Sequence, residues 1–186
     1  MDMLLRYLVE NGIGNDLAKG VLQHFQQKEY KKGSTILDMG ENTFVVCFII
    51  KGIARGYYIN DNGQDITKCF SAENSWCCIY NMLHDTPSEF WIEALEDCIL
   101  AEISVDKLRK VLSSNIEFQA LFAKSCCEAF MDTDEKGVCF QRVQAKERYL
   151  RFLELYPNLE KRIKQEYIAS YIGITPTSLS RIKRNL

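Results

Sequence analysis

The sequence predicts an α+β fold in which an antiparallel β roll is followed by a long helix and a small all-α segment. Three observations lead to this prediction. Short runs of β-branched and aromatic residues separated by glycines fill the first 104 residues, the apolar spacing becomes helical after Ser104, and basic residues gather near the C-terminus. With 47% hydrophobic residues and 3 Pro in 186 residues, the chain can bury a core and has no linker-like stretch.

Strand-like runs dominate the first half of the chain. Asn62-Gly63 is the clearest turn signal, because a two-residue type I′ turn needs positive φ at both central positions, and it predicts a hairpin between residues 57–59 and 65–67. The N-terminal residues, about 2–28, have a helical pattern instead. The predicted strands are enough for a small antiparallel, jelly-roll-like β roll. They are residues 34–37, 44–50, 53–59, 66–70, 90–95 and 99–103.

A long amphipathic helix is expected after the roll. Ser104 can cap a first helix, and from Ile116 onward apolar residues repeat at helical spacing, with Gly137 marking a point where this second helix is expected to bend or break. An apolar stripe of this length would be exposed to water unless another surface packs against it. We expect a second copy of the chain, and packing on its own roll is the alternative. The predicted dimer-interface residues are Phe118, Leu121, Phe122, Cys126, Ala129 and Phe130.

The charge of the chain is unevenly divided. Residues 141–186 contain ten basic and four acidic side chains, a net charge of +6, whereas residues 1–140 have a net charge of −8. Such a basic segment attracts nucleic-acid phosphates, and an ordinary solvated helix surface is the alternative. The expected organisation is a sensor-like β-roll domain at 1–112, a dimerisation helix at 113–143 and a DNA-binding domain at 144–186.

Residues 165–184 match a helix-turn-helix pattern. Gly173 lies at the turn, where positive φ is required, and Ala169 allows two helices to approach closely. Thr175 suits an N-cap and Pro176 suits the first turn of a second helix. Arg181 on that helix is the best candidate to bond guanine O6 and N7 in a major groove. The predicted DNA-binding residues are Gln165, Thr175, Thr177, Ser178, Arg181, Lys183 and Arg184.

Several other kinds of protein find no support in the sequence. The eight cysteines include no CxxC spacing, so no metal site is expected, and only the neighbouring pairs Cys77-Cys78 and Cys126-Cys127 are candidates for sensing an oxidant. No GxSxG, HExxH, P-loop or dinucleotide motif occurs, so we expect no catalytic residues and no enzyme. No apolar run reaches bilayer length and no signal peptide is recognisable, so we expect a cytoplasmic protein without membrane contact.

In this order, the β roll, long helix and helix-turn-helix resemble the Crp/Fnr superfamily of bacterial transcription regulators. The resemblance rests on Gly33, Gly40-Glu41, Lys51-Gly52 and residues 101–104 in the roll, and on residues 165–184 in the tail. Residues 147–149 and 168–176 are similar to the Bacteroidetes branch. The resemblance implies a homodimer on palindromic double-stranded DNA, RNA polymerase as a further partner, and an unknown small-molecule effector. Because the sequence ends at Leu186, no β wing is expected.

The cyclic-nucleotide pocket that the resemblance implies is degenerate in this sequence. In members that bind cyclic AMP, a Gly-Glu pair holds the ribose, and an Arg followed by Ser or Thr holds the phosphate. Cys78 and Ile79 fall in the first region of this chain, and Ser88-Glu89 falls in the second. A carboxylate repels an anion that an Arg would clamp. We therefore expect neither cyclic AMP nor cyclic GMP to bind.

The other sensor types of the family fit no better. An iron–sulfur cluster is not expected, because the first cysteine is Cys47, already within the roll. Haem is not expected either, because only His24 and His84 are available. The alternative to a DNA-binding regulator is a ligand- or redox-sensing module whose basic tail binds a protein partner. Binding of duplex DNA that depends steeply on salt would distinguish the two.

Overall fold

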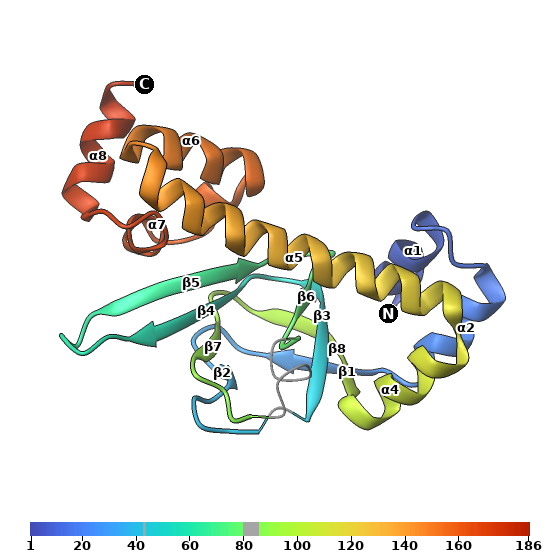
Figure 1. The fold of residues 1–186 in the computed structure, drawn as a ribbon. Coiled ribbons are helices and arrows are strands. Elements are labelled where there is room, and N and C mark those ends of the chain that lie inside the picture. The colour runs from blue at the N-terminus through green and yellow to red at the C-terminus, as the bar shows by residue number, and fades with distance from the viewer. Residues whose placement is uncertain (43, 80–85) are drawn as a thin grey trace. The chain divides into compact units, whose positions relative to one another are not determined.

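The computed structural model describes residues 1–42, 44–79 and 86–186; Thr43 and residues 80–85, among them His84, lie outside the described residues. Strands fill most of the first half and helices the second (Figure 1). The strands are β1 (Gln26–Tyr30), β2 (Thr35–Leu37), β3 (Val45–Lys51), β4 (Ala54–Ile59), β5 (Asp65–Ser71), β6 (Trp76–Cys77), β7 (Trp91–Ala94) and β8 (Cys98–Ser104). The helices are α1 (Asp2–Glu10), α2 (Asn15–Leu22), α4 (Val105–Ser114), α5 (Ile116–Arg142), α6 (Ala145–Leu155), the 3-10 helix η1 (Leu159–Lys161), α7 (Gln165–Tyr171) and α8 (Pro176–Arg184).

The described strands form two four-stranded sheets, ordered β1-β8-β3-β6 and β2-β7-β4-β5. In the first sheet β3 pairs antiparallel with β8, with Val46 opposite Ile103 and Phe48 opposite Ala101. Side chains along β3 alternate between two buried clusters, since successive residues of a strand face opposite sides of the sheet. This two-sided burial explains why β3 is an unbroken apolar run.

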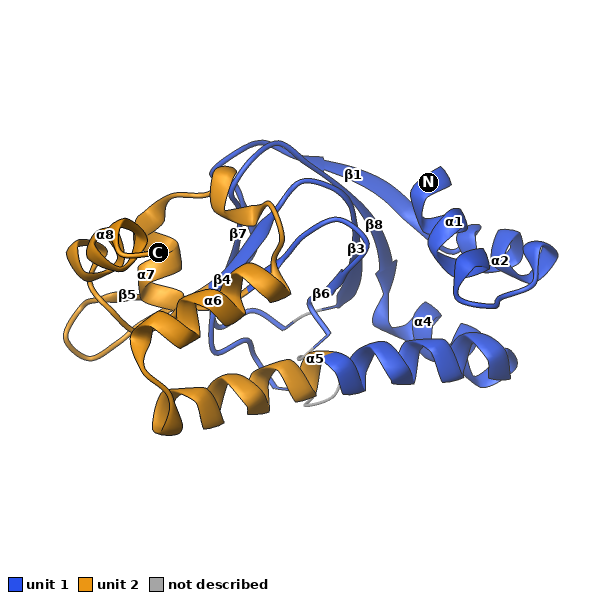
Figure 2. Ribbon diagram, turned by 90° about the horizontal axis from the view of Figure 1, so that it is seen from above, with its two compact units in different colours: residues 1–56, 70–128 blue, residues 57–69, 129–186 orange. Residues whose placement is uncertain are grey.

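The chain divides into two compact units, which Figure 2 colours separately. Unit 1 comprises residues 1–56 and 70–128, and unit 2 comprises residues 57–69 and 129–186. The tip of the β4–β5 hairpin therefore belongs with the C-terminal helices, and α5 contributes to both units. The predicted organisation placed the hairpin with the roll. The hairpin joins unit 2 because Thr67 N donates to Ser170 Oγ at 2.8 Å and Ser170 Oγ donates to the Asp65 carbonyl at 3.1 Å.

The first half of α5 packs within unit 1, which is the alternative that the sequence analysis left open for this helix. Phe118, Leu121 and Phe122 are buried. Their core contains Trp76, whose ring centroid lies 5.2 Å from that of Phe122 and 6.4 Å from that of Phe118. These three side chains expose 0%, 7% and 4% of their surface, so most of their apolar area is already covered within unit 1. Of the other predicted interface residues, Cys126 is half-buried, whereas Ala129 and Phe130 are exposed.

The β4–β5 hairpin has a longer turn than the two-residue one predicted. Gly63 has a φ of +73°, but Asn62 does not have positive φ. Gly63 N donates to the Asn60 carbonyl at 2.8 Å, and Asn60 N donates to the Gln64 carbonyl at 3.0 Å. The Asn60 side chain also accepts from Asn62 N and Gln64 N. This three-residue loop uses one left-handed glycine instead of two left-handed residues.

Other expectations for local structure are confirmed in part. The predicted helical segment at about 2–28 contains two helices separated by a turn at Gly12, whose φ is +92°, but its last residues belong to strand β1 at 26–30. Ser104 caps α4 by accepting from Lys107 N. Helix α5 continues through Gly137 to Arg142 without the expected break. No described helix combines the length and the apolar character needed to cross a membrane.

Candidate nucleic-acid interface

Helices α7 and α8 of unit 2 form the helix-turn-helix that the sequence predicts. Ile168, Ala169 and Leu179 have no exposed surface and fill the space between the helices. The chain turns at Gly173, whose φ is +69°. A Cβ at this position would lie only 2.2 Å from Cε1 of Phe140, on α5. Glycine is therefore required both for the backbone conformation and for the close approach of the ring.

Helix α8 begins where the sequence predicts, at Pro176. Thr175 is its N-cap, and the threonine hydroxyl accepts from Ser178 N at 3.2 Å and donates to Ser178 Oγ at 3.0 Å. The cap satisfies one of the free amides of the first turn, and Pro176 leaves none to satisfy at its own position. Both features fix the direction in which α8 leaves the turn.

The predicted DNA-binding residues divide into exposed side chains and side chains that already have partners. Thr177, Arg181 and Arg184 are exposed on α8, and Gln165 is exposed at the start of α7. Thr175 is also exposed, but its hydroxyl is engaged in the cap together with the half-buried Ser178. Thr177 and Arg181 are one helical turn apart, so they lie on one face of α8.

Lys183 has a structural partner, which the sequence analysis did not foresee. Its ammonium pairs with the Glu160 carboxylate, which also accepts from the Tyr149 hydroxyl at 2.5 Å. The hydrogen bonds from Lys183 and Tyr149 hold the pKa of Glu160 below its ordinary value. Lys183 thus attaches α8 to η1, and its charge is already compensated. Its contact with DNA stays a prediction.

Arg148 supports the turn of the motif from α6. Its Nε donates to the Ile172 carbonyl at 2.9 Å, and its Nη1 donates to the Val143 carbonyl at 2.7 Å. The guanidinium lies 5.0 Å from the centroid of the Phe140 ring. In the sequence, Arg148 contributes to the positive charge of the tail and to the family resemblance of residues 147–149, but its structural role is not evident. Its structural role shows in the hydrogen bonds that it donates to carbonyls at the ends of two helices. These contacts form only in the folded chain, so the sequence alone does not predict them.

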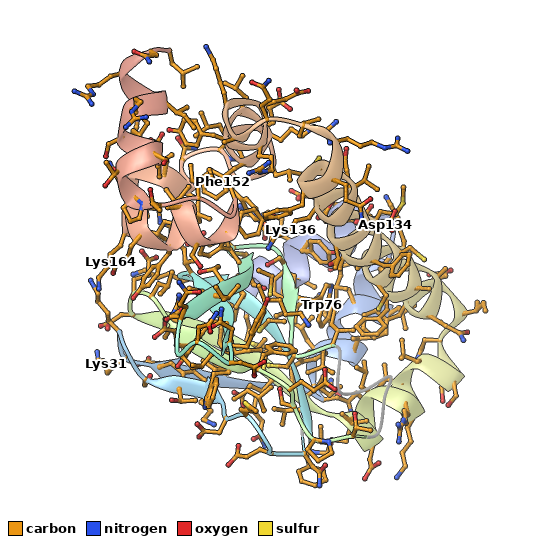
Figure 3. The ribbon with its side chains drawn as sticks, turned by 60° about the vertical axis from the view of Figure 1, so that its left-hand side comes forward. Lys31, Trp76, Asp134, Lys136, Phe152 and Lys164 are labelled. Carbon is orange, nitrogen blue, oxygen red and sulfur yellow. The ribbon has the colours of Figure 1, made fainter. Side chains whose placement is uncertain are left out.

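Lys136 connects α5 to the hairpin and to α7 (labelled in Figure 3). Its Nζ donates to the Lys68 carbonyl at 2.8 Å and lies 3.9 Å from the centroid of the Tyr171 ring. Burial lowers the pKa of Lys136 to about 8 and raises the pKa of Tyr171 to about 12. Lys136 therefore belongs to the framework behind the helix-turn-helix.

The four residues of the degenerate pocket lie in unit 1. Cys78 is buried and has a φ of +62°, and Ile79 is half-buried. Ser88 is buried as well, and its hydroxyl donates to the Phe90 carbonyl at 2.7 Å. Glu89 is exposed. Neither Ser88 nor Glu89 offers a positive charge to a phosphate, and the Ser88 hydroxyl already has an acceptor.

Comparison with known proteins finds one matching domain family and many solved structures of similar fold. Residues 27–115 match the family described as the cyclic nucleotide-binding domain. No curated protein sequence matches significantly. FixK2 from Bradyrhizobium japonicum aligns with a TM-score of 0.76 and 16% identity, over 87% of this chain and 84% of that one.

Two other solved structures are similar over most of their length. A CooA mutant from Carboxydothermus hydrogenoformans aligns with a TM-score of 0.75 and 18% identity, over 98% of this chain and 83% of that one. The regulator CLP from Xanthomonas campestris gives a TM-score of 0.73 and 14% identity, over 92% and 91%. At these identities the likeness shows the fold. Residues 27–115 thus match the model of the cyclic nucleotide-binding domain, and the chain as a whole shares its fold with the FixK2, CooA and CLP structures.

Proposed function

We propose that this protein is a homodimeric, sequence-specific DNA-binding transcription regulator of the Crp/Fnr type that does not respond to cyclic AMP. The observation that carries the proposal is helix α8, which begins at a capped, glycine-dependent turn and presents Thr177, Arg181 and Arg184 to solvent. Residues 141–186, which include α8, have a net charge of +6. Phosphates attract such a segment, and polar side chains on a helix read base edges in the major groove.

The second half of α5 supplies the surface for a second copy. Phe130 is 72% exposed and Met131 is 66% exposed, and the exposed Ala129 precedes them. Exposed aromatic and methionine side chains on one helix favour a helix-to-helix interface. A dimer presents two copies of α8, which matches two half-sites of a palindromic site.

The relatives' own descriptions agree with a role in gene regulation. CLP is described as a c-di-GMP-responsive global regulator that affects virulence gene expression. We infer the same general role for this chain, with RNA polymerase and a small-molecule effector as its further partners. The helix-turn-helix supports one part of this role directly, which is binding to double-stranded DNA.

Arg181 is expected to provide most of the sequence selectivity. When bound duplexes are selected from a random pool at about 0.15 M salt, the wild-type protein should enrich an inverted repeat. The Arg181→Ala variant should lose about 1–3 kcal/mol of discrimination, or about 5- to 150-fold in the ratio of specific to non-specific affinity. Competition binding of the enriched site against random duplex measures this ratio.

Arg6→Ala is the matched control, because Arg6 is also an exposed arginine on a helix but lies on α1 of unit 1. The control should keep the wild-type ratio. If the folded wild-type dimer enriched no duplex, or if Arg6→Ala reduced the ratio as much as Arg181→Ala, the proposed DNA contact would be wrong. The alternative of a tail that binds a protein partner would then be favoured.

Cyclic AMP is expected neither to bind the roll nor to change the affinity for the enriched DNA. The reason is the missing phosphate clamp, since Ser88 uses its hydroxyl within the loop and Glu89 brings a negative charge. Isothermal titration with cyclic AMP should give only the heat of dilution. A saturable one-to-one heat, or a cyclic-AMP-dependent shift in DNA affinity, would contradict this expectation.

A further inference from the structure

Three cysteines from separate parts of the sequence meet inside unit 1. The Sγ atoms of Cys47, Cys77 and Cys78 all lie within 4.8 Å of one another. All three residues are buried, with exposed fractions of 0%, 6% and 5%, and none forms a disulfide. The sequence predicts no metal site here, because the cysteines have no CxxC spacing. The cluster belongs to unit 1, whereas the helix-turn-helix belongs to unit 2.

The sheet explains how the three thiols come together. Cys47 on β3 is directly opposite Cys77 on β6 in an antiparallel pair, so both side chains point to the same face. The next side chain along a regular strand would point to the opposite face. Cys78 instead has a left-handed backbone with φ +62°, and its side chain joins the same buried cluster as the other two. A non-glycine residue in this conformation is uncommon and marks a local constraint.

The geometry and chemistry of the cluster suit a soft ion. Thiolate sulfurs lie about 2.3 Å from a bound soft ion, so three sulfurs around one centre stand about 4 Å apart when the centre is planar and somewhat closer when it is pyramidal. The observed separations, all within 4.8 Å, are close to this spacing. Among the described residues, the group consists of sulfur ligands alone. Sulfur ligands select thiophilic ions over hard cations such as Mg²⁺ or Ca²⁺.

The electrostatic surroundings favour one charge for that ion. The Glu102 carboxylate lies 4.0 Å from Cys47 Sγ, and it also accepts from the Tyr30 hydroxyl at 2.6 Å and pairs with Lys28 at 3.7 Å. A buried complex with a net negative charge is costly beside this carboxylate. Three thiolates leave a net charge of −2 with a monovalent ion and −1 with a divalent ion. With a trivalent centre the complex is neutral.

We propose that Cys47, Cys77 and Cys78 form a binding site for a trivalent thiophilic metalloid, of which arsenite is the simplest form. Arsenous acid, As(OH)₃, reacts with three thiols to give one As(S)₃ centre and three molecules of water. Each As–O bond is replaced by an As–S bond, and each thiol proton leaves with a hydroxide. No electron is transferred, so the step needs no oxidant or reductant. This proposal concerns unit 1 and does not depend on DNA binding.

Native mass spectrometry of the full-length protein with sodium arsenite, in a phosphine reductant, tests the site. The wild-type protein should gain one arsenic and lose three hydrogens. The single variants Cys47→Ser, Cys77→Ser and Cys78→Ser should each lose this adduct entirely. The double variant Cys126→Ser with Cys127→Ser is the control, because it removes a neighbouring pair of thiols outside the cluster, and it should keep the adduct. Circular dichroism checks that each variant is folded.

Tryptophan fluorescence gives a second readout that does not require a variant. Trp76 precedes Cys77 in β6, so its emission should change and saturate at one equivalent of arsenite. Failure of the folded wild-type protein to form the adduct would overturn the proposal. So would an adduct that persists in the three cluster variants or disappears in the control. Tight binding of zinc or copper(I) without binding of arsenite would refute the charge argument, and the proposal with it.

Discussion

The Phe118→Ala variant is expected to lose about 3–5 kcal/mol of unfolding free energy, the range for truncating a fully buried phenylalanine. Phe118 has no exposed surface and packs beside Trp76 and Phe122. The truncation leaves a cavity in a tightly packed aromatic cluster, which cannot close without moving α5. Since a domain has about 5–15 kcal/mol of stability in total, the loss should be plain in urea unfolding followed by circular dichroism.

Phe130→Ala is the comparison that separates core from interface on the same helix. Phe130 is 72% exposed, so its truncation should change the unfolding free energy of the monomer by no more than about 0.5 kcal/mol. It should instead raise the dissociation constant of the proposed dimer, measured by sedimentation at several concentrations. Equal losses of monomer stability in the two variants would show that α5 is not divided into a buried half and an exposed half.

The Gly173→Ala variant should disrupt the helix-turn-helix and abolish specific DNA binding. A left-handed backbone costs a non-glycine residue about 1–2 kcal/mol, and the new methyl group would also need the space that the Phe140 ring occupies. Displacing this ring disturbs the packing beneath the turn and the Arg148 guanidinium above it. Thermal unfolding and binding to the selected duplex measure the two effects.

Gly137→Ala provides the matched control for this substitution. Gly137 lies within α5, has an ordinary helical φ, and has no atom within 4 Å of a Cβ built on it. Alanine there should stabilise the helix by up to about 1 kcal/mol, because glycine has a higher entropic cost in a helix. If Gly173→Ala were as stable as Gly137→Ala and bound DNA normally, the close approach of Phe140 to the turn would not be needed.

The parts of the fold that the sequence predicts well are those specified by local interactions. Thr175 and Pro176 marked the start of α8 because capping and φ preferences act within one helical turn. Strand β6 was not predicted, because its two residues are too few to show an alternation of apolar and polar side chains. The apolar spacing of α5 was recognised, but spacing does not say what covers a stripe. Only the position of Trp76 decides that Phe118 faces its own core.

The candidate sites also divide into residues that the sequence alone identifies and residues that depend on tertiary contacts. Arg181 could be selected from its place on a predicted helix, since exposure on one face follows from the periodicity. Lys183 could not be distinguished from it, because its pairing with Glu160 spans 23 residues and depends on how η1 lies against α8. The cysteine cluster depends on the pairing of β3 with β6 and on the left-handed backbone of Cys78, neither of which a spacing rule detects.

The contacts of Ser170 with β5 have a consequence for the behaviour of the chain in concentrated solution. Strand β5 is at the edge of its sheet, where unpaired backbone groups can template pairing with another molecule. Ser170 Oγ bonds to Thr67 N and the Asp65 carbonyl, and Lys136 Nζ bonds to the Lys68 carbonyl. Helix α7 and α5 therefore shield this edge from edge-to-edge aggregation. The residues that support the DNA-binding motif thus also keep the β hairpin from joining a foreign sheet.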